Sequence, residues 1–117
     1  MEWLSGEWAP VSVVMNGQAL PPQFISHGSR TMTGNEVKVI FFGELMVHAK
    51  IRLDETADPV KVDYFNLGQQ NVSYGILSRE GDEVTSNISA PGEARPVDFT
   101  SNEGSNRTLS RWRKNQP

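Results

Sequence analysis

The sequence predicts an all-β protein, a small closed antiparallel β-barrel of eight or nine strands. No window of about 11 residues carries the apolar stripe of an amphipathic helix. Instead, short runs rich in β-branched and aromatic residues recur roughly every 10 residues, which is the spacing of small barrels and sandwiches. Glycine, proline and asparagine separate these runs. Closure into a barrel is favoured because it removes the unpaired edges of an open sheet.

Turn residues end each run in the first third of the chain. The run 8–15 stops at Asn16-Gly17, a dipeptide that favours a tight turn because both residues tolerate positive φ. Pro21-Pro22 then interrupts the chain, since proline lacks a backbone N–H donor. The segment 22–28 is the one stretch that we expect to form a short helical turn.

The remaining runs pair as hairpins across polar connections. The first pair turns at Gly34-Asn35, the second across 54–59 and the third across 80–83. One run before the polar loop 101–106 and one after it complete a single barrel domain over residues 1–117. The expected strands are 8–15, 30–33, 37–42, 44–53, 61–67, 72–79, 84–89, 97–100 and 108–114.

Composition excludes several classes of function. The 117 residues contain no cysteine, which excludes disulfides, thiolate zinc sites and cysteine nucleophiles. A net charge of −3 argues against nucleic acid as a partner, because phosphate binding needs a basic face. The two histidines are isolated, and no glycine-rich loop precedes a helix. We therefore expect no metal and no nucleotide cofactor.

The N-terminus and the longest apolar run bear on location. The first residues show no basic segment followed by an apolar one, so we expect no signal peptide. The apolar run 39–42 is far too short to cross a bilayer. We expect a cytoplasmic protein without membrane contact.

Five short motifs occur in a fixed order along the chain. They are Gly-x-Trp at 6–8, Asn16-Gly17, Gly81-Asp82, Pro91-Gly92 and Arg95-Pro96. This order, in register over nearly the whole chain, resembles a small bacterial lipocalin-like β-barrel domain family that is mostly of unknown function. The resemblance implies a closed barrel with Trp8 packed at one end. It implies little about function, because fold does not determine function.

Alternation of side chains along the strands predicts polar residues in the barrel interior. Val84 and Ile88 mark the inner face of their strand, so Ser86 between them points inward. Leu77 assigns Arg79 to the inner face in the same way. The lipocalin-like family typically has aliphatic side chains at such places. The residues expected inside are Arg30, Tyr64, Arg79, Ser86 and Ser110, with Trp112 on the same face as Ser110.

Two explanations of this polar interior remain open. Burying a guanidinium without a partner costs several kcal/mol. The polar residues therefore line a wet pocket, or the strand registers are shifted by one residue, which exchanges the two faces. In a pocket, Arg30 and Arg79 would bind an anion through their forked N–H groups. Tyr64 and Trp112 would form walls for an aromatic body.

Three side chains are candidates for proton transfer. Glu44 follows Gly43, where a bulge would turn its carboxylate inward to act as acid or base. His27 lies in the segment expected over one barrel end, and Tyr74 is placed to donate a proton to an oxyanion. Each has a plainer interpretation, as a rim carboxylate, a turn residue or a wall residue. His48 is expected on the outer face of its strand.

These residues predict a cofactor-independent enzyme that binds a small anionic, aromatic metabolite. The reaction would be a cyclisation, condensation or isomerisation in natural-product biosynthesis, as in small lipocalin-like cyclases that the chain resembles in architecture. The alternative is a non-catalytic carrier of the same ligand, and a third possibility is a structural domain with a filled core. The expected partner is a carboxylate-bearing small molecule, and a homodimer is a further expectation.

Overall fold

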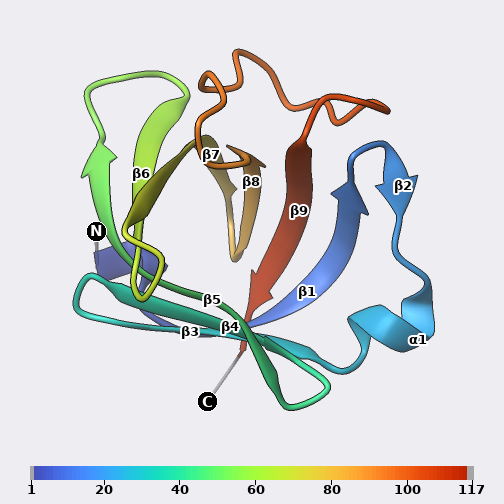
Figure 1. Ribbon diagram of the computed structural model, residues 1–117. Helices are drawn as coiled ribbons and strands as arrows, with labels where there is room; N and C mark the ends of the chain where they lie inside the picture. Colours follow the sequence, from blue (N-terminus) through green and yellow to red (C-terminus); the bar gives the residue numbers. More distant parts are fainter. Residues whose placement is uncertain (1, 116–117) are drawn as a thin grey trace.

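The computed structural model describes residues 2–115 and confirms an all-β barrel (Figure 1). A 3-10 turn, η1 (Glu2–Leu4), precedes the first strand, and a short helix, α1 (Pro22–Ile25), lies within the expected segment 22–28. No helix within the described residues has the length and apolar character needed to cross a membrane. The strands are β1 (Gly6–Met15), β2 (Gln18–Ala19), β3 (Gly28–Thr33), β4 (Glu36–Phe41), β5 (Glu44–Asp54), β6 (Val60–Asn66), β7 (Asn71–Glu80), β8 (Glu83–Ser89) and β9 (Arg107–Lys114).

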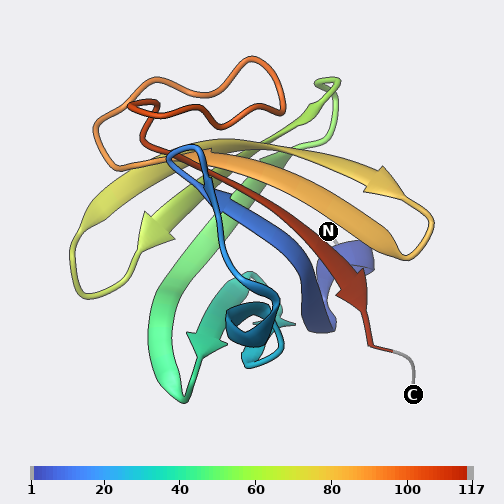
Figure 2. The same cartoon turned by 90° about the vertical axis from the view of Figure 1, so that its right-hand side faces the viewer.

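Antiparallel pairing of neighbouring strands closes the barrel. From β3 to β9 each strand pairs with the next one along the chain, and β1 pairs with both β3 and β9. Eight strands therefore form the ring, and β2 is an additional short strand beside the end of β1. Figures 1 and 2 show the ring from two directions, with the loop between β8 and β9 running across the top in both views.

Strand pairing in the ring is shortest between β1 and β3. These two strands pair only over the first three residues of β1, and the pairing ends at Trp8 opposite Arg30. Further along, the last two residues of β1, Val14 and Met15, pair with β2 instead. The chain between β2 and β3, which includes α1, covers the place where β1 and β3 separate (Figure 2). One side of the barrel is thus closed by a short helix instead of by strand pairing.

The prediction of a strand at 97–100 is wrong, because these residues lie in the loop 90–106. Residues 97–100 form no strand, because β8 already pairs with β7 on one edge and with β9 on the other. The loop instead lies on the outer face of β8. There the buried Asn87 side chain donates hydrogen bonds of 2.8 Å to the carbonyl oxygens of Asp98 and Thr100.

Asp63, on the outer face of β6, fastens this loop to the barrel. Arg95 in the loop donates to the Val62 and Gly75 carbonyls at 3.0 and 2.9 Å and to Asp63 Oδ1 at 2.6 Å. Arg52 donates to the other Asp63 oxygen at 2.8 Å. Burial raises the pKa of Asp63, but the hydrogen bonds and charges of the two arginines outweigh it and lower the pKa below its ordinary value.

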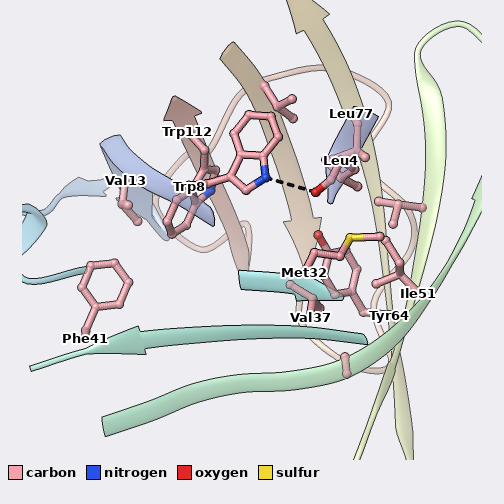
Figure 3. Close-up of a cluster of buried hydrophobic side chains, with 13 residues drawn as sticks. Leu4, Trp8, Val13, Met32, Val37, Phe41, Ile51, Tyr64, Leu77 and Trp112 are labelled. Carbon is pink, nitrogen blue, oxygen red and sulfur yellow. Dashed lines mark hydrogen bonds between the residues drawn. The ribbon is translucent and has the colours of Figure 1, made fainter. Parts of the chain in front are cut away.

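The apolar core fills one end of the barrel. Leu4 of η1 is fully buried, and the Trp8 indole Nε1–H donates to its carbonyl oxygen at 3.0 Å (Figure 3). Met32, Val37 and Leu77 are buried in the same cluster. This packing closes the end of the barrel beside η1, where Trp8 is buried.

Candidate functional site

A cavity of about 350 Å³ occupies the other end of the barrel. Its lining includes Val13 and Met15 from the second half of β1, and Pro91 and Asn106 from the two ends of the β8–β9 loop. Neither Leu4 nor Trp8 borders it. The interior is therefore divided along the barrel into a packed end and a hollow end.

Five of the six residues predicted to bind a ligand line this cavity. All five are buried, and their strands present them inward as alternation predicts, so the one-residue shift of register does not apply to these strands. Their role in binding stays a prediction. They are Arg30, Tyr64, Ser86, Ser110 and Trp112.

Arg30 is the most unusual side chain in the cavity wall. Only 2% of its surface is exposed, and its Nη2 group donates to the Tyr64 hydroxyl oxygen at 3.3 Å. Within residues 2–115 it forms no ion pair and no other side-chain hydrogen bond. Because the Tyr64 oxygen accepts this bond, its own O–H remains free to donate. The pair thus offers several unused donors on the cavity wall.

A second polar group lies on β8 and β9. Ser86 and Ser110 are directly opposite each other across these strands, and their hydroxyl oxygens are 2.8 Å apart. The Trp112 indole Nε1–H donates to the Ser110 oxygen at 2.8 Å. This bond fixes the Trp112 ring against the cavity, where its centroid lies 6.4 Å from that of Phe41.

Apolar side chains form the rest of the wall, and glycine shapes one part of it. Phe24 of α1 stacks on Phe41 of β4 with a centroid distance of 5.0 Å. Gly28 allows this arrangement, because a Cβ there would lie 2.3 Å from Phe41 Cε1. The apolar lining residues are Val13, Met15, Leu20, Phe24, Val39, Phe41, Met46, Val47, Ile88, Ala90 and Pro91, together with the ring of Trp112.

Arg79, the sixth predicted binding residue, does not line the cavity, and this prediction of position is wrong. Its pairing with Val84 does place it on the inner face of the sheet. However, it follows Leu77 toward the packed end, beyond the point where η1 closes the barrel. There it is exposed, and its guanidinium carbon lies 5.3 Å from the centroid of the Trp3 ring.

The three candidates for proton transfer also lie outside the cavity. Glu44 is exposed at the start of β5, and the bulge in the β4–β5 pairing brings Met46 to the cavity instead. His27 is exposed and stacks on the Phe42 ring at 4.4 Å. Tyr74 is 38% exposed on the outer face of β7 under the Arg95 guanidinium. None of the three is therefore among the residues that line the cavity.

Five polar residues of the wall were not among the predicted ligand contacts: Asn66, Ser73, Ser89, Asn106 and Thr108. Ser73 lies opposite Tyr64 in the β6–β7 pairing, and Asn66 Nδ2 donates to its hydroxyl at 3.1 Å. Counting back in twos from Leu77 identifies Ser73, and counting forward from Tyr64 identifies Asn66. The signal was thus present in the alternation of these strands.

His48 lies on the outer face of β5, as expected, with its Nε2 atom 2.5 Å from Glu36 Oε2. The hydrogen bond with His48 lowers the pKa of Glu36. In the described part of the chain, no three His, Asp or Glu side chains are grouped to hold a metal ion.

Comparisons of the chain with known protein families, with curated proteins and with solved structures find no match. The lipocalin-like resemblance therefore stays a prediction.

Proposed function

We propose that the protein binds a small anionic, largely apolar molecule in the hollow end of the barrel and does so without catalysis. One observation carries this proposal. Arg30 is positively charged and only 2% exposed, and no carboxylate among residues 2–115 forms an ion pair with it. A ligand anion would supply the missing partner.

The geometry of Arg30 suits a carboxylate. A guanidinium carries five N–H donors in a planar fork, and one of them is used by Tyr64. The others suit the two oxygens of a carboxylate, and charge-assisted bonds of this kind are stronger than neutral ones. The free Tyr64 O–H adds a donor at the same place. Arg30 and Tyr64 together therefore form the proposed anion site.

The remaining wall suits an apolar, preferably aromatic, body. Its volume of about 350 Å³ lies within the range of small-molecule pockets. Phe41 and Trp112 present ring surfaces, and the aliphatic residues of β1, β4 and β5 line the other sides. Aromatic carboxylates combine both features.

Binding without catalysis is favoured over the acid–base enzyme. No Asp, Glu or His side chain lies among the residues lining the cavity within the described chain. General acid–base catalysis most often uses one of these groups, and the one tyrosine in the wall, Tyr64, belongs to the proposed anion site. The lipocalin-like resemblance fits this proposal, since a barrel of this shape holds its ligand inside.

The test is a titration with 2-naphthoate and with its neutral counterpart, 2-naphthamide. Binding is followed by calorimetry and by tryptophan fluorescence, to which Trp112 in the cavity wall contributes together with Trp3 and Trp8. We expect 2-naphthoate to bind and R30M to weaken it by about 10- to 100-fold, the value of hydrogen bonds to a charged group. R79M is the matched control, because Arg79 is exposed outside the cavity. Equal affinity for naphthoate and naphthamide, or equal affinity of R30M and wild type for naphthoate, would contradict the proposal.

A further inference from the structure

We propose a second polar subsite in the same cavity, at which Ser86 and Ser110 donate one hydrogen bond to a carbonyl oxygen of the ligand. The inference rests on the proposed function, because it describes the same ligand further along its length. The ligand class is then an apolar carboxylate that also carries a ketone or similar carbonyl group.

The hydrogen-bonded group of Trp112, Ser110 and Ser86 has one donor hydrogen more than it has hydrogen bonds. The three side chains carry three donor hydrogens, one N–H and two O–H. Two hydrogen bonds join them, from Trp112 to Ser110 and between the two serines. Whichever serine donates in the second bond, the other serine keeps an O–H with no acceptor among the residues that the structure describes.

The free O–H is both buried and accessible to a ligand. Ser86 is 2% and Ser110 6% exposed, yet both line the cavity. An unmade hydrogen bond in such a place is costly, so a ligand that supplies an acceptor gains affinity over one that does not. The indole N–H of Trp112 is already used, which leaves its ring as a flat apolar wall beside the subsite.

The subsite is separate from the anion site. Arg30 lies on β3 and Tyr64 on β6, whereas the two serines lie on β8 and β9. Within the described chain, neither serine forms a hydrogen bond with Arg30 or Tyr64. A ligand that satisfies both sites must therefore carry two acceptor groups held apart by its apolar body.

The test compares carboxylates that differ only in a carbonyl group. 3- and 4-Benzoylbenzoate carry a ketone between two rings, and 3- and 4-benzylbenzoate carry a methylene there. We expect at least one ketone isomer to bind wild-type protein about three- to tenfold more tightly than its methylene partner, the value of one net hydrogen bond. Equal affinities within both pairs would overturn the subsite and leave the anion site standing.

The matched variants are W112F and S86A/S110A/W112F, which differ only in two hydroxyl groups. W112F retains two hydroxyls joined by one bond, so one O–H stays free and the ketone preference should persist. The triple variant has no such donor, and its ketone-to-methylene ratio should fall to about one. A preference that survives in the triple variant would contradict the assignment. Binding of 2-naphthoate to both variants reports separately on the anion site, and if no carboxylate binds any form of the protein, both proposals fail.

Photochemistry of the benzophenone group gives a second measurement that needs no variant. On irradiation the ketone inserts into a C–H bond beside its carbonyl carbon. We expect attachment of the bound benzoylbenzoate to wild-type protein within β8 or β9, near Ser86 or Ser110. Attachment confined to Met46 at the β4–β5 bulge would place the carbonyl elsewhere and overturn the proposal.

Discussion

Replacing Arg30 by methionine should make the empty protein more stable. Methionine is unbranched, flexible and able to fill irregular apolar space, but it is shorter than arginine and carries no charge. Arg30 is 2% exposed and has one side-chain hydrogen bond, to Tyr64, in the described structure. An unpaired buried charge costs several kcal/mol even after the surroundings relax. Without ligand, the guanidinium therefore opposes folding more than it supports it.

The expected size of the effect follows from these opposing terms. The several kcal/mol of desolvation are offset by the bond to Tyr64 and by solvent that enters the open cavity, which leaves a net gain of about 1–2 kcal/mol. For 117 residues the entropy of unfolding near 60 °C is about 0.25 kcal/mol/K. The midpoint of thermal unfolding of R30M should thus rise by about 4–8 °C.

The assay is thermal and urea unfolding of wild type, R30M and R79M without ligand and with 2-naphthoate. R79M should lose no more than about 1 kcal/mol, because it removes one exposed contact with Trp3. At 100 times its dissociation constant, the naphthoate should stabilise wild type by about 2.7 kcal/mol and leave R30M nearly unchanged. If empty R30M is less stable than wild type by more than about 1 kcal/mol, Arg30 is a structural residue and the argument for an anion site fails.

Two further predictions concern the parts of the fold that shape the cavity and hold the loop. D63N should cost about 2–3 kcal/mol at pH 7, because Arg52 and Arg95 lose their shared carboxylate. The pKa of Asp63 is lower in the folded state than its ordinary 3.8, so this stabilisation is complete above about pH 4 and is lost as the pH falls through the folded value. Urea unfolding of wild type and D63N from pH 7 to pH 2 measures this loss. A difference in stability between the two proteins that does not change with pH would contradict the prediction. G28A should cost about 1–3 kcal/mol, because its Cβ displaces the Phe41 ring. Adding F41L should relieve part of that loss in urea unfolding, whereas strictly additive effects would show that the two residues do not interact.

Alternation along single strands predicted the inner face correctly because side-chain direction in a strand is a local property. Val84 and Ile88 are strongly apolar, so they fixed the face of Ser86 without knowledge of any neighbouring strand. The same reasoning placed Arg30 inside, although a buried arginine contradicts simple hydrophobic patterning. Where apolar residues lie two positions before and after a polar residue in a strand, they predict the face on which the polar side chain lies.

Position along the barrel axis could not be predicted in this way. Arg79 shares the face of Leu77 but lies beside Trp3 at the end that η1 closes, and that closure depends on contacts far apart in sequence. Glu44 was expected at a bulge, yet the extra residue in the β4–β5 register is at Met46. Such shifts are set by the pairing of two strands, so one strand's sequence does not reveal them.

The outer face was predicted least well because a loop covers part of it. The run 97–100 has the composition of a strand, but closure of the ring leaves β8 no free edge with which to pair. The loop is held instead by the side chains of Asn87 and Arg95. Asp63 points outward, yet it is buried because this loop brings Arg95 onto it.

The low apolar content of the chain, 37% hydrophobic residues, and the hollow end of the barrel have the same origin. Small serines occupy three inward positions, Ser73, Ser86 and Ser110, on the three consecutive strands β7, β8 and β9. Three aliphatic side chains there would reduce the cavity and bring its wall closer to a packed core. The same positions and Arg30 supply the donors that lack acceptors when the cavity is empty. The space and the unmet hydrogen bonds therefore arise together, and one ligand of the proposed class would fill the first and satisfy the second.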